Sequence, residues 1–293
     1  MFPIIPAASA ADSGNQEGIF GFGYNSGSTA VSNLVSNTGV VATDVAGVGT
    51  GRYGIKACEY GGDKGIFAYG NDGTWQSMSN LVSNAGVVST DVTGVGTVRY
   101  KPGACSYGED KGIFGFGHTG TTTAVTNLVS NAGVVATDQA AVTGTARYSP
   151  AACEYGEDKG IFGFGNNSSH AATGMTNLVS NSGVVSTDVT AVGTARSAAA
   201  ACAYGEDKGI FSFGSYSATN LVSNVGVVAT DVTQVGTSRN QLVATQYGGD
   251  KGIFGYGSGR TNITNLVSNV GVVGTDVAGV GTARDELGAC SFN

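Results

Sequence analysis

Short apolar runs recur along the whole chain, and glycine, asparagine or another turn-forming residue bounds each of them. In residues 111–117, Lys-Gly-Ile-Phe-Gly-Phe-Gly, the aromatic side chains alternate with glycine, as expected of the two-residue period of a β-strand. Residues 126–130 and the β-branched run at 134–137 also have strand-like lengths and compositions. No segment has the 3.6-residue period of a helix, so the pattern predicts an all-β protein.

This group of runs occurs six times. The motif Asn-Leu-Val-Ser-Asn begins at Asn33, Asn80, Asn127, Asn177, Asn220 and Asn265, so successive repeats are 43 to 50 residues apart. In the third repeat, an Ala-Cys strand and a Gly-Glu-Asp turn precede residues 111–117, which gives four strands in all. Four strands in a repeat of this length are typical of a propeller blade. We therefore predict a six-bladed β-propeller in residues 15–293, with four antiparallel strands per blade.

The two ends of the repeat array complement each other. Residues 17–23 form a second strand that has no first strand before it, whereas residues 288–293 form a first strand that has no second strand after it. Pairing them would leave no open sheet edge. The sequence thus predicts that the N-terminal strand, residues 17–23, completes the C-terminal blade and closes the ring.

Alternation along the second strand predicts how the blades pack. Side chains two residues apart lie on the same face of a sheet, so Phe114 and Phe116 are expected to share one face. That face would press on the glycine-, alanine- and cysteine-rich face of the neighbouring blade. One position of that surface is a cysteine in five repeats: Cys58, Cys105, Cys153, Cys202 and Cys290. We expect small buried thiols there rather than disulfides.

Length variation and unusual chemistry are concentrated in the segment that follows the second strand. Its length is 9, 9, 9, 11, 5 and 7 residues in the six repeats. Odd lengths are expected of a hairpin, because adding one residue to each arm preserves the pairing register. The candidate binding residues lie in these hairpins, which a propeller places on one face: Tyr24, Trp75, His118, His170, Tyr216 and Arg260. The opposite face should be nearly uniform.

An aspartate and an arginine lie eight or nine residues apart in each connection between repeats, as in Asp44 and Arg52. We interpret them as ion pairs or loop-fixing hydrogen bonds rather than a metal site, because arginine would neutralise a ring of carboxylates. The two histidines lie in unequal loops, and no nucleophile has a recurrent histidine neighbour. The sequence predicts no enzyme activity, no cofactor and no metal.

Composition narrows the range of partners. Charged residues make up 12% of the chain and the net charge is −7, which argues against nucleic-acid binding. No apolar stretch approaches the roughly 18 residues of a membrane-spanning helix, so membrane insertion is not expected. Residues 1–14 are interpreted as an N-terminal arm, in which Phe2, Ile4 and Ile5 could dock to a partner chain.

The repeat unit resembles known propeller families. The Arg-Tyr strand that leads through Ala-Cys to Lys-Gly-Ile-Phe-Gly-Phe-Gly is similar to a kelch-type blade, although adjacent glycines and an outer-strand tryptophan are absent. The units Gly-Asp-Lys-Gly-Ile-Phe-Gly, Thr-Asn-Leu-Val-Ser-Asn and Gly-Val-Gly-Thr-Ala-Arg resemble those of propeller proteins encoded by tailed bacteriophages. The resemblance to kelch-type blades covers residues 17–293, and the resemblance to the phage proteins implies a virion component: a tail-fibre, tail-tip or head-decoration protein.

The leading hypothesis is thus a non-enzymatic structural protein on the virion surface. Its partners would be other virion proteins, bound through the uniform face or the arm, while the diverse hairpins face a host-surface glycan or protein. The alternative is a lectin-like propeller that uses Trp75, Tyr24, Tyr216 and the histidines to bind glycans.

Overall fold

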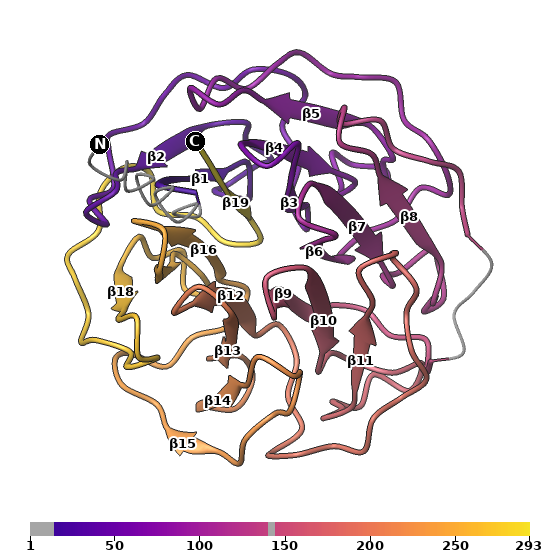
Figure 1. The fold of residues 1–293 in the computed structure, drawn as a ribbon. Coiled ribbons are helices and arrows are strands. Elements are labelled where there is room, and N and C mark those ends of the chain that lie inside the picture. The colour runs from indigo at the N-terminus through magenta and orange to yellow at the C-terminus, as the bar shows by residue number, and fades with distance from the viewer. Residues whose placement is uncertain (1–14, 140–143) are drawn as a thin grey trace, which may run out of the picture.

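The computed structural model describes residues 15–139 and 144–293, and within them it contains strands and no helix. Six antiparallel sheets account for all the strands (Figure 1). In chain order the strands are β1 (Glu17–Gly21), β2 (Ser32–Val35), β3 (Lys56–Tyr60), β4 (Lys64–Ala68), β5 (Ser79–Val82), β6 (Gly103–Tyr107), β7 (Lys111–Gly115), β8 (Thr126–Val129), β9 (Ala151–Tyr155), β10 (Lys159–Gly163), β11 (Thr176–Val179), β12 (Ala200–Tyr204), β13 (Lys208–Ser212), β14 (Ala218–Val222), β15 (Val232–Thr233), β16 (Val243–Tyr247), β17 (Lys251–Gly255), β18 (Thr264–Val267) and β19 (Gly288–Phe292).

Each sheet is a meander in which the glycine- and phenylalanine-containing strand is central. In the sheet β6-β7-β8, Ile113 pairs with Cys105 on one side and with Leu128 on the other. The turn at residues 108–110 joins β6 to β7, with Gly108 and Glu109 at positive φ. We call the end of the sheets that carries this turn and its equivalents the tip end. The opposite end, which carries the variable hairpins, is the loop end.

The sheet at the two chain ends has the order β19-β1-β2. Ile19 of β1 lies opposite Cys290 of β19 and opposite Leu34 of β2, as in the other sheets. The predicted pairing of the N-terminal strand with the C-terminal strand is therefore confirmed.

The fourth strand of each repeat is less regular than the sequence predicts. Within the described residues, only the sheet β12-β13-β14-β15 has four strands. In the third repeat Val135 pairs with Val129, but Gln139 pairs with Thr126, so the outer segment contains one residue more than its partner. Such a bulge interrupts the ladder. The side-chain amide of Asn127 donates two hydrogen bonds to this bulged segment instead.

The sheets follow one another around a common centre in chain order (Figure 1). Their first strands are in contact from sheet to sheet: β3 with β6, β6 with β9, β9 with β12, β12 with β16, β16 with β19, and β19 with β3. Backbone hydrogen bonds link the same neighbours at the tip end, for example from Gly61 N to Asp110 O at 2.8 Å and from Asn293 N to Asp63 O at 3.1 Å. The second of these bonds joins the last described residue to the second sheet.

The hydrophobic core lies between neighbouring sheets, and aromatic pairs are its largest members. Ring centroids are 5.1–5.3 Å apart in the pairs Phe22–Phe67, Tyr69–Phe114, Phe116–Phe162, Phe164–Phe211, Phe213–Phe254 and Tyr256–Phe20. Thus Phe114 contacts the preceding sheet and Phe116 the following one. The expectation that they share a face is wrong, because Phe116 has a φ of 63° and leaves the strand conformation.

The prediction that bulky groups of one sheet press on small residues of the next is confirmed. A Cβ atom on Gly115 would lie 3.0 Å from Cζ of Phe162, and one on Gly112 would lie 2.5 Å from Sγ of Cys58. All five cysteines are buried and free, as the sequence predicts. Burial raises the pKa of the Cys58 thiol well above its ordinary value, so these cysteines act as small apolar groups.

Candidate functional site

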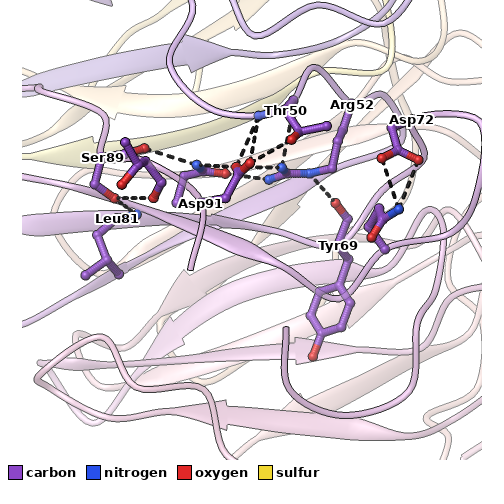
Figure 2. Close-up of polar contacts among 10 residues, drawn as sticks. Thr50, Arg52, Tyr69, Asp72, Leu81, Ser89 and Asp91 are labelled. Carbon is purple, nitrogen blue, oxygen red and sulfur yellow. Dashed lines mark hydrogen bonds and ion pairs between the residues drawn. The ribbon is translucent and has the colours of Figure 1, made fainter. Parts of the chain in front are cut away.

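A buried arginine anchors each connection between sheets. The side chain of Arg52 is fully buried: its Nε donates to the carbonyl of Tyr69 at 3.0 Å and its Nη2 to Oδ1 of Asn80 at 2.6 Å (Figure 2). Its guanidinium carbon also lies 4.9 Å from the centroid of Phe22 in the preceding sheet. The arginine thus joins two neighbouring sheets.

Four of the six arginines form an ion pair, and in each case the acidic partner differs from the one that the sequence suggests. Arg52 does not pair with Asp44 in its own connection, but with Asp91, at 3.4 Å between Nη1 and Oδ1. Asp91 also accepts hydrogen bonds from the backbone and hydroxyl of Thr50 and from Asn80 (Figure 2). Burial alone would raise the pKa of Asp91, but these hydrogen bonds and the arginine charge together lower it. The acid-base sets are therefore structural, as predicted, with different partners.

The variable segments form the hairpins that their odd lengths predict. In two of the nine-residue segments the backbone of the first residue pairs with that of the fifth, as in Asn71 with Trp75 and His118 with Thr122. In the eleven-residue segment the first residue, Asn166, pairs with the seventh. The added pair of residues therefore lengthens the hairpin without changing its register.

Aromatic side chains on these hairpins and on the neighbouring connections form a continuous group at the loop end. Tyr24 contacts Tyr53, which contacts Tyr100, with centroids 5.2 and 5.6 Å apart. A second series runs from Trp75 through His118 and Tyr148 to His170, at 5.6–5.9 Å. The backbones of Tyr100 and His118 pair with each other, which joins the two series. We call these seven residues the aromatic arc.

Three members of the aromatic arc, Tyr53, Tyr100 and Tyr148, were not among the residues that the sequence singled out. Each follows the buried arginine of its repeat, whereas serine, asparagine or aspartate follows it in the other three. The Arg-Tyr dipeptide in three successive repeats was the available signal. This dipeptide lies outside the variable hairpins. It precedes the first strand, however, and the hairpin follows the antiparallel second strand, so both lie at the same end of the sheet.

The other two candidate residues differ in position. Arg260 is exposed, and its guanidinium carbon lies 5.1 Å from the centroid of Tyr24, at one end of the aromatic arc. Tyr216 is 54% exposed and makes no ring contact with any residue in the described ranges. Beside it, the equivalent positions carry small polar residues: Ser197, Ser215, Asn240 and Ser258. The aromatic arc is thus confined to one side of the loop end.

A cycle of six backbone hydrogen bonds surrounds the centre of the loop end. Each member donates its N–H to the carbonyl of the preceding member, at 2.9–3.3 Å, and has a φ of 51–62°: Gly54, Lys101, Ser149, Ala198, Gln241 and Glu286. Glu286 accepts hydrogen bonds from Tyr100 and Gln241 and pairs with Lys101 at 2.6 Å. The pocket inside the cycle has a volume of about 20 Å³, enough for about one water molecule.

A separate cavity lies toward the tip end of the first strands. It has a volume of about 60 Å³ and is lined by the cysteine strands, with Glu59 and Glu154 among the lining residues. Burial, reinforced by the negative charge of Glu59, raises the pKa of Glu154 well above its usual range. Burial also raises the pKa of Glu59, although the hydroxyl of Ser291 donates a hydrogen bond to it, which lowers that pKa.

The shifted carboxyl predicts a stability that falls as pH rises. Because the folded state holds the Glu154 proton more tightly than the unfolded state, its ionisation above the ordinary pKa of 4.5 disfavours folding. We therefore expect Glu154→Gln to be more stable than the natural protein at neutral pH, with the difference vanishing near pH 4.5, in urea unfolding at both pH values. The matched control, Glu157→Gln at an exposed turn, should change little. A Glu154→Gln protein that is less stable at neutral pH would contradict this.

Charge is distributed unequally between the two ends. The connections contain six arginines and six aspartates, and each of five turns at the tip end contains one lysine beside one aspartate. At the loop end Lys56, Lys101 and Arg260 balance Asp72, Asp285 and Glu286. Six glutamates form no ion pair within the described ranges, and all belong to tip-end segments: Glu17, Glu59, Glu109, Glu154, Glu157 and Glu206. The loop end is therefore neutral and the tip end acidic.

Other kinds of site find no support in the part of the chain that the structure describes. There, no three or more histidine, cysteine or acidic side chains are grouped so as to hold a metal ion. The same residues form no helix of the length and apolarity that crossing a membrane requires. The predicted docking residues Phe2, Ile4 and Ile5 lie outside the described residues.

Comparison of the chain with models of known protein families and with curated proteins found no match.

Proposed function

We propose that the six sheets form a closed six-bladed β-propeller, and that this propeller is a non-enzymatic structural protein of a tailed-phage virion. In this proposal the tip end docks to the particle, as part of the tail or as a head decoration, and the aromatic arc faces a host surface. The observation that carries it is the opposition of the two ends: one presents a varied aromatic surface, and the other repeats the same chemistry around the centre.

Contacts among the first strands support the closed arrangement. They run from sheet to sheet and return to the starting sheet, and the loop-end hydrogen-bond cycle does the same. Closure also accounts for the pairing of β1 with β19, because it would leave no sheet open at the junction of the chain ends.

Two features of the tip end support its role in docking. Asn15 is buried there, and its carbonyl accepts a hydrogen bond from Gly249 at 3.2 Å, so residues 1–14 join the propeller at that end. A valine follows the tight turn of every repeat at the rim and is 63–65% exposed: Val40, Val87, Val134, Val184, Val227 and Val272. Repeated apolar exposure of this kind is typical of an interaction surface.

Cryo-electron microscopy of purified particles tests the proposal directly. We expect six-bladed rings at fixed positions, bound by the tip end with the aromatic arc outward, and we expect loss of incorporation when residues 1–14 are deleted. Particles without such rings, or rings whose aromatic arc is buried against the particle, would contradict the virion role or its orientation. Intact incorporation after the deletion would remove the arm from the docking surface.

A further inference from the structure

We propose that the aromatic arc is a binding track for a neutral glycan chain. This inference rests on the proposed function, because it names the chemistry of the host-surface contact. It uses three observations about the loop end: the contacts between the rings, the polar groups beside them, and the balance of charge.

The rings are held in place before any ligand binds. Tyr53 is fixed between Tyr24 and Tyr100, and Tyr148 lies between the two histidines, with its hydroxyl 3.1 Å from Nδ1 of His170. All four tyrosines of the aromatic arc are partly exposed, so their side chains are packed in part and remain in part accessible to a ligand. Rigid aromatic groups lose little conformational entropy on binding, which favours their use as contact surfaces.

The surroundings of the rings suit a ligand that is apolar on its faces and hydroxylated at its edges. Asn71 and Asn166 lie at hairpin positions equivalent to those of Tyr24 and His118. Within the hairpins, Ser28 lies opposite Tyr24 and Thr122 lies opposite His118. A sugar ring places C–H groups against an aromatic face and directs its hydroxyls outward, where amide and hydroxyl side chains can donate and accept hydrogen bonds. A lipid surface would leave the amide and hydroxyl groups without a partner.

The charge balance separates neutral glycans from acidic ones. Lys101 is held in an ion pair with Glu286, and Arg260 lies over Tyr24 and is attracted by Asp285. A charged ligand would have to displace Glu286 from Lys101. Arg260 is a single exposed cation at one end of the aromatic arc, and the charge of Asp285 offsets it. Stacking and neutral hydrogen bonds would therefore supply the affinity.

The full chain should be titrated calorimetrically with two panels of oligosaccharides. One panel contains neutral chains of glucose, galactose, mannose or N-acetylglucosamine, and the other contains uronic-acid and sialic-acid chains. We expect binding to a neutral chain, little affected by salt, and roughly tenfold weaker in Tyr53→Ala and in Trp75→Ala, since each removes one aromatic contact. Tyr216→Ala is the matched control, because it removes an exposed tyrosine outside the aromatic arc.

Three results would overturn the inference: no binding to any neutral chain, preference for the acidic panel, or an equal loss in Tyr216→Ala. Unchanged melting temperatures of the variants would show that the losses are not due to unfolding. Adsorption of particles to host cells separates this inference from the proposed function. Adsorption that requires the aromatic arc without any glycan binding would overturn the inference alone, whereas adsorption that does not depend on the aromatic arc would overturn the proposed host contact.

Discussion

Replacing Arg52 with alanine should lower the free energy of unfolding by about 3 kcal/mol, measured by urea denaturation. The guanidinium is fully buried and joins Tyr69, Asn80 and Asp91 through hydrogen bonds and an ion pair. Without it, the buried amide oxygen of Asn80 loses the donor of its 2.6 Å hydrogen bond, and the connection between the first two sheets loses its anchor.

Arg99 provides a matched comparison for this experiment. It occupies the equivalent position and is equally buried, and it lies 3.9 Å above the ring of Tyr69, but its Nε and Nη1 atoms have no hydrogen-bond partner. Arg99→Ala should therefore cost clearly less than Arg52→Ala. Equal losses at the two sites would show that stacking on the aromatic ring, rather than the hydrogen-bond network, provides the stability.

Placing a methyl group on Gly112 should destabilise the protein by about 2–3 kcal/mol through overpacking. The added Cβ would lie 2.5 Å from Sγ of Cys58 and 3.0 Å from the backbone oxygen of Glu59, across the boundary between two sheets. Thermal and urea unfolding of Gly112→Ala would measure the loss.

A double-mutant cycle with Cys58→Ala isolates the cause. Removing the sulfur relieves the closest contact, so the double variant should be more stable than the sum of the two single losses predicts. Additive losses would mean that the backbone contact with Glu59, and not the thiol, excludes a side chain at Gly112.

The sequence was sufficient for features that depend on repetition. Six copies of one pattern place Cys58 and its equivalents at a single structural position, and their burial follows from the small residues around them. The same logic identifies the unmatched strands at residues 17–23 and 288–293, whose pairing the structure contains. The odd hairpin lengths correctly indicated an unchanged pairing register.

Features that depend on a local departure from ideal geometry could not be predicted in this way. The alternation rule assumes that Phe116 continues the strand, but its left-handed backbone turns the ring toward the next sheet. Similarly, spacing suggested Asp44 as the partner of Arg52, because the two are close in sequence. The actual partner, Asp91, is 39 residues further on, and only the path of the chain between neighbouring sheets brings it close.

The candidate site was recovered in part for a related reason. Tryptophan and histidine are rare in the chain, so Trp75 and His118 stand out in the sequence. Tyr53 and Tyr100 lie in the connections between repeats, where the recurrent aspartate and arginine are the more conspicuous pattern. Two segments of each repeat reach the same end of a sheet, and ring contacts between neighbouring repeats join them. No pattern within a single repeat records those contacts.

The unequal distribution of charge gives the molecule a permanent electric dipole. The unpaired glutamates lie at the tip end of the sheets, while the loop end carries no net charge. A basic support, such as an amine-coated sensor chip at an ionic strength of about 0.01 M, would attract the acidic end over a distance of roughly 30 Å. Molecules immobilised in this way would share one orientation, with every aromatic arc directed into solution.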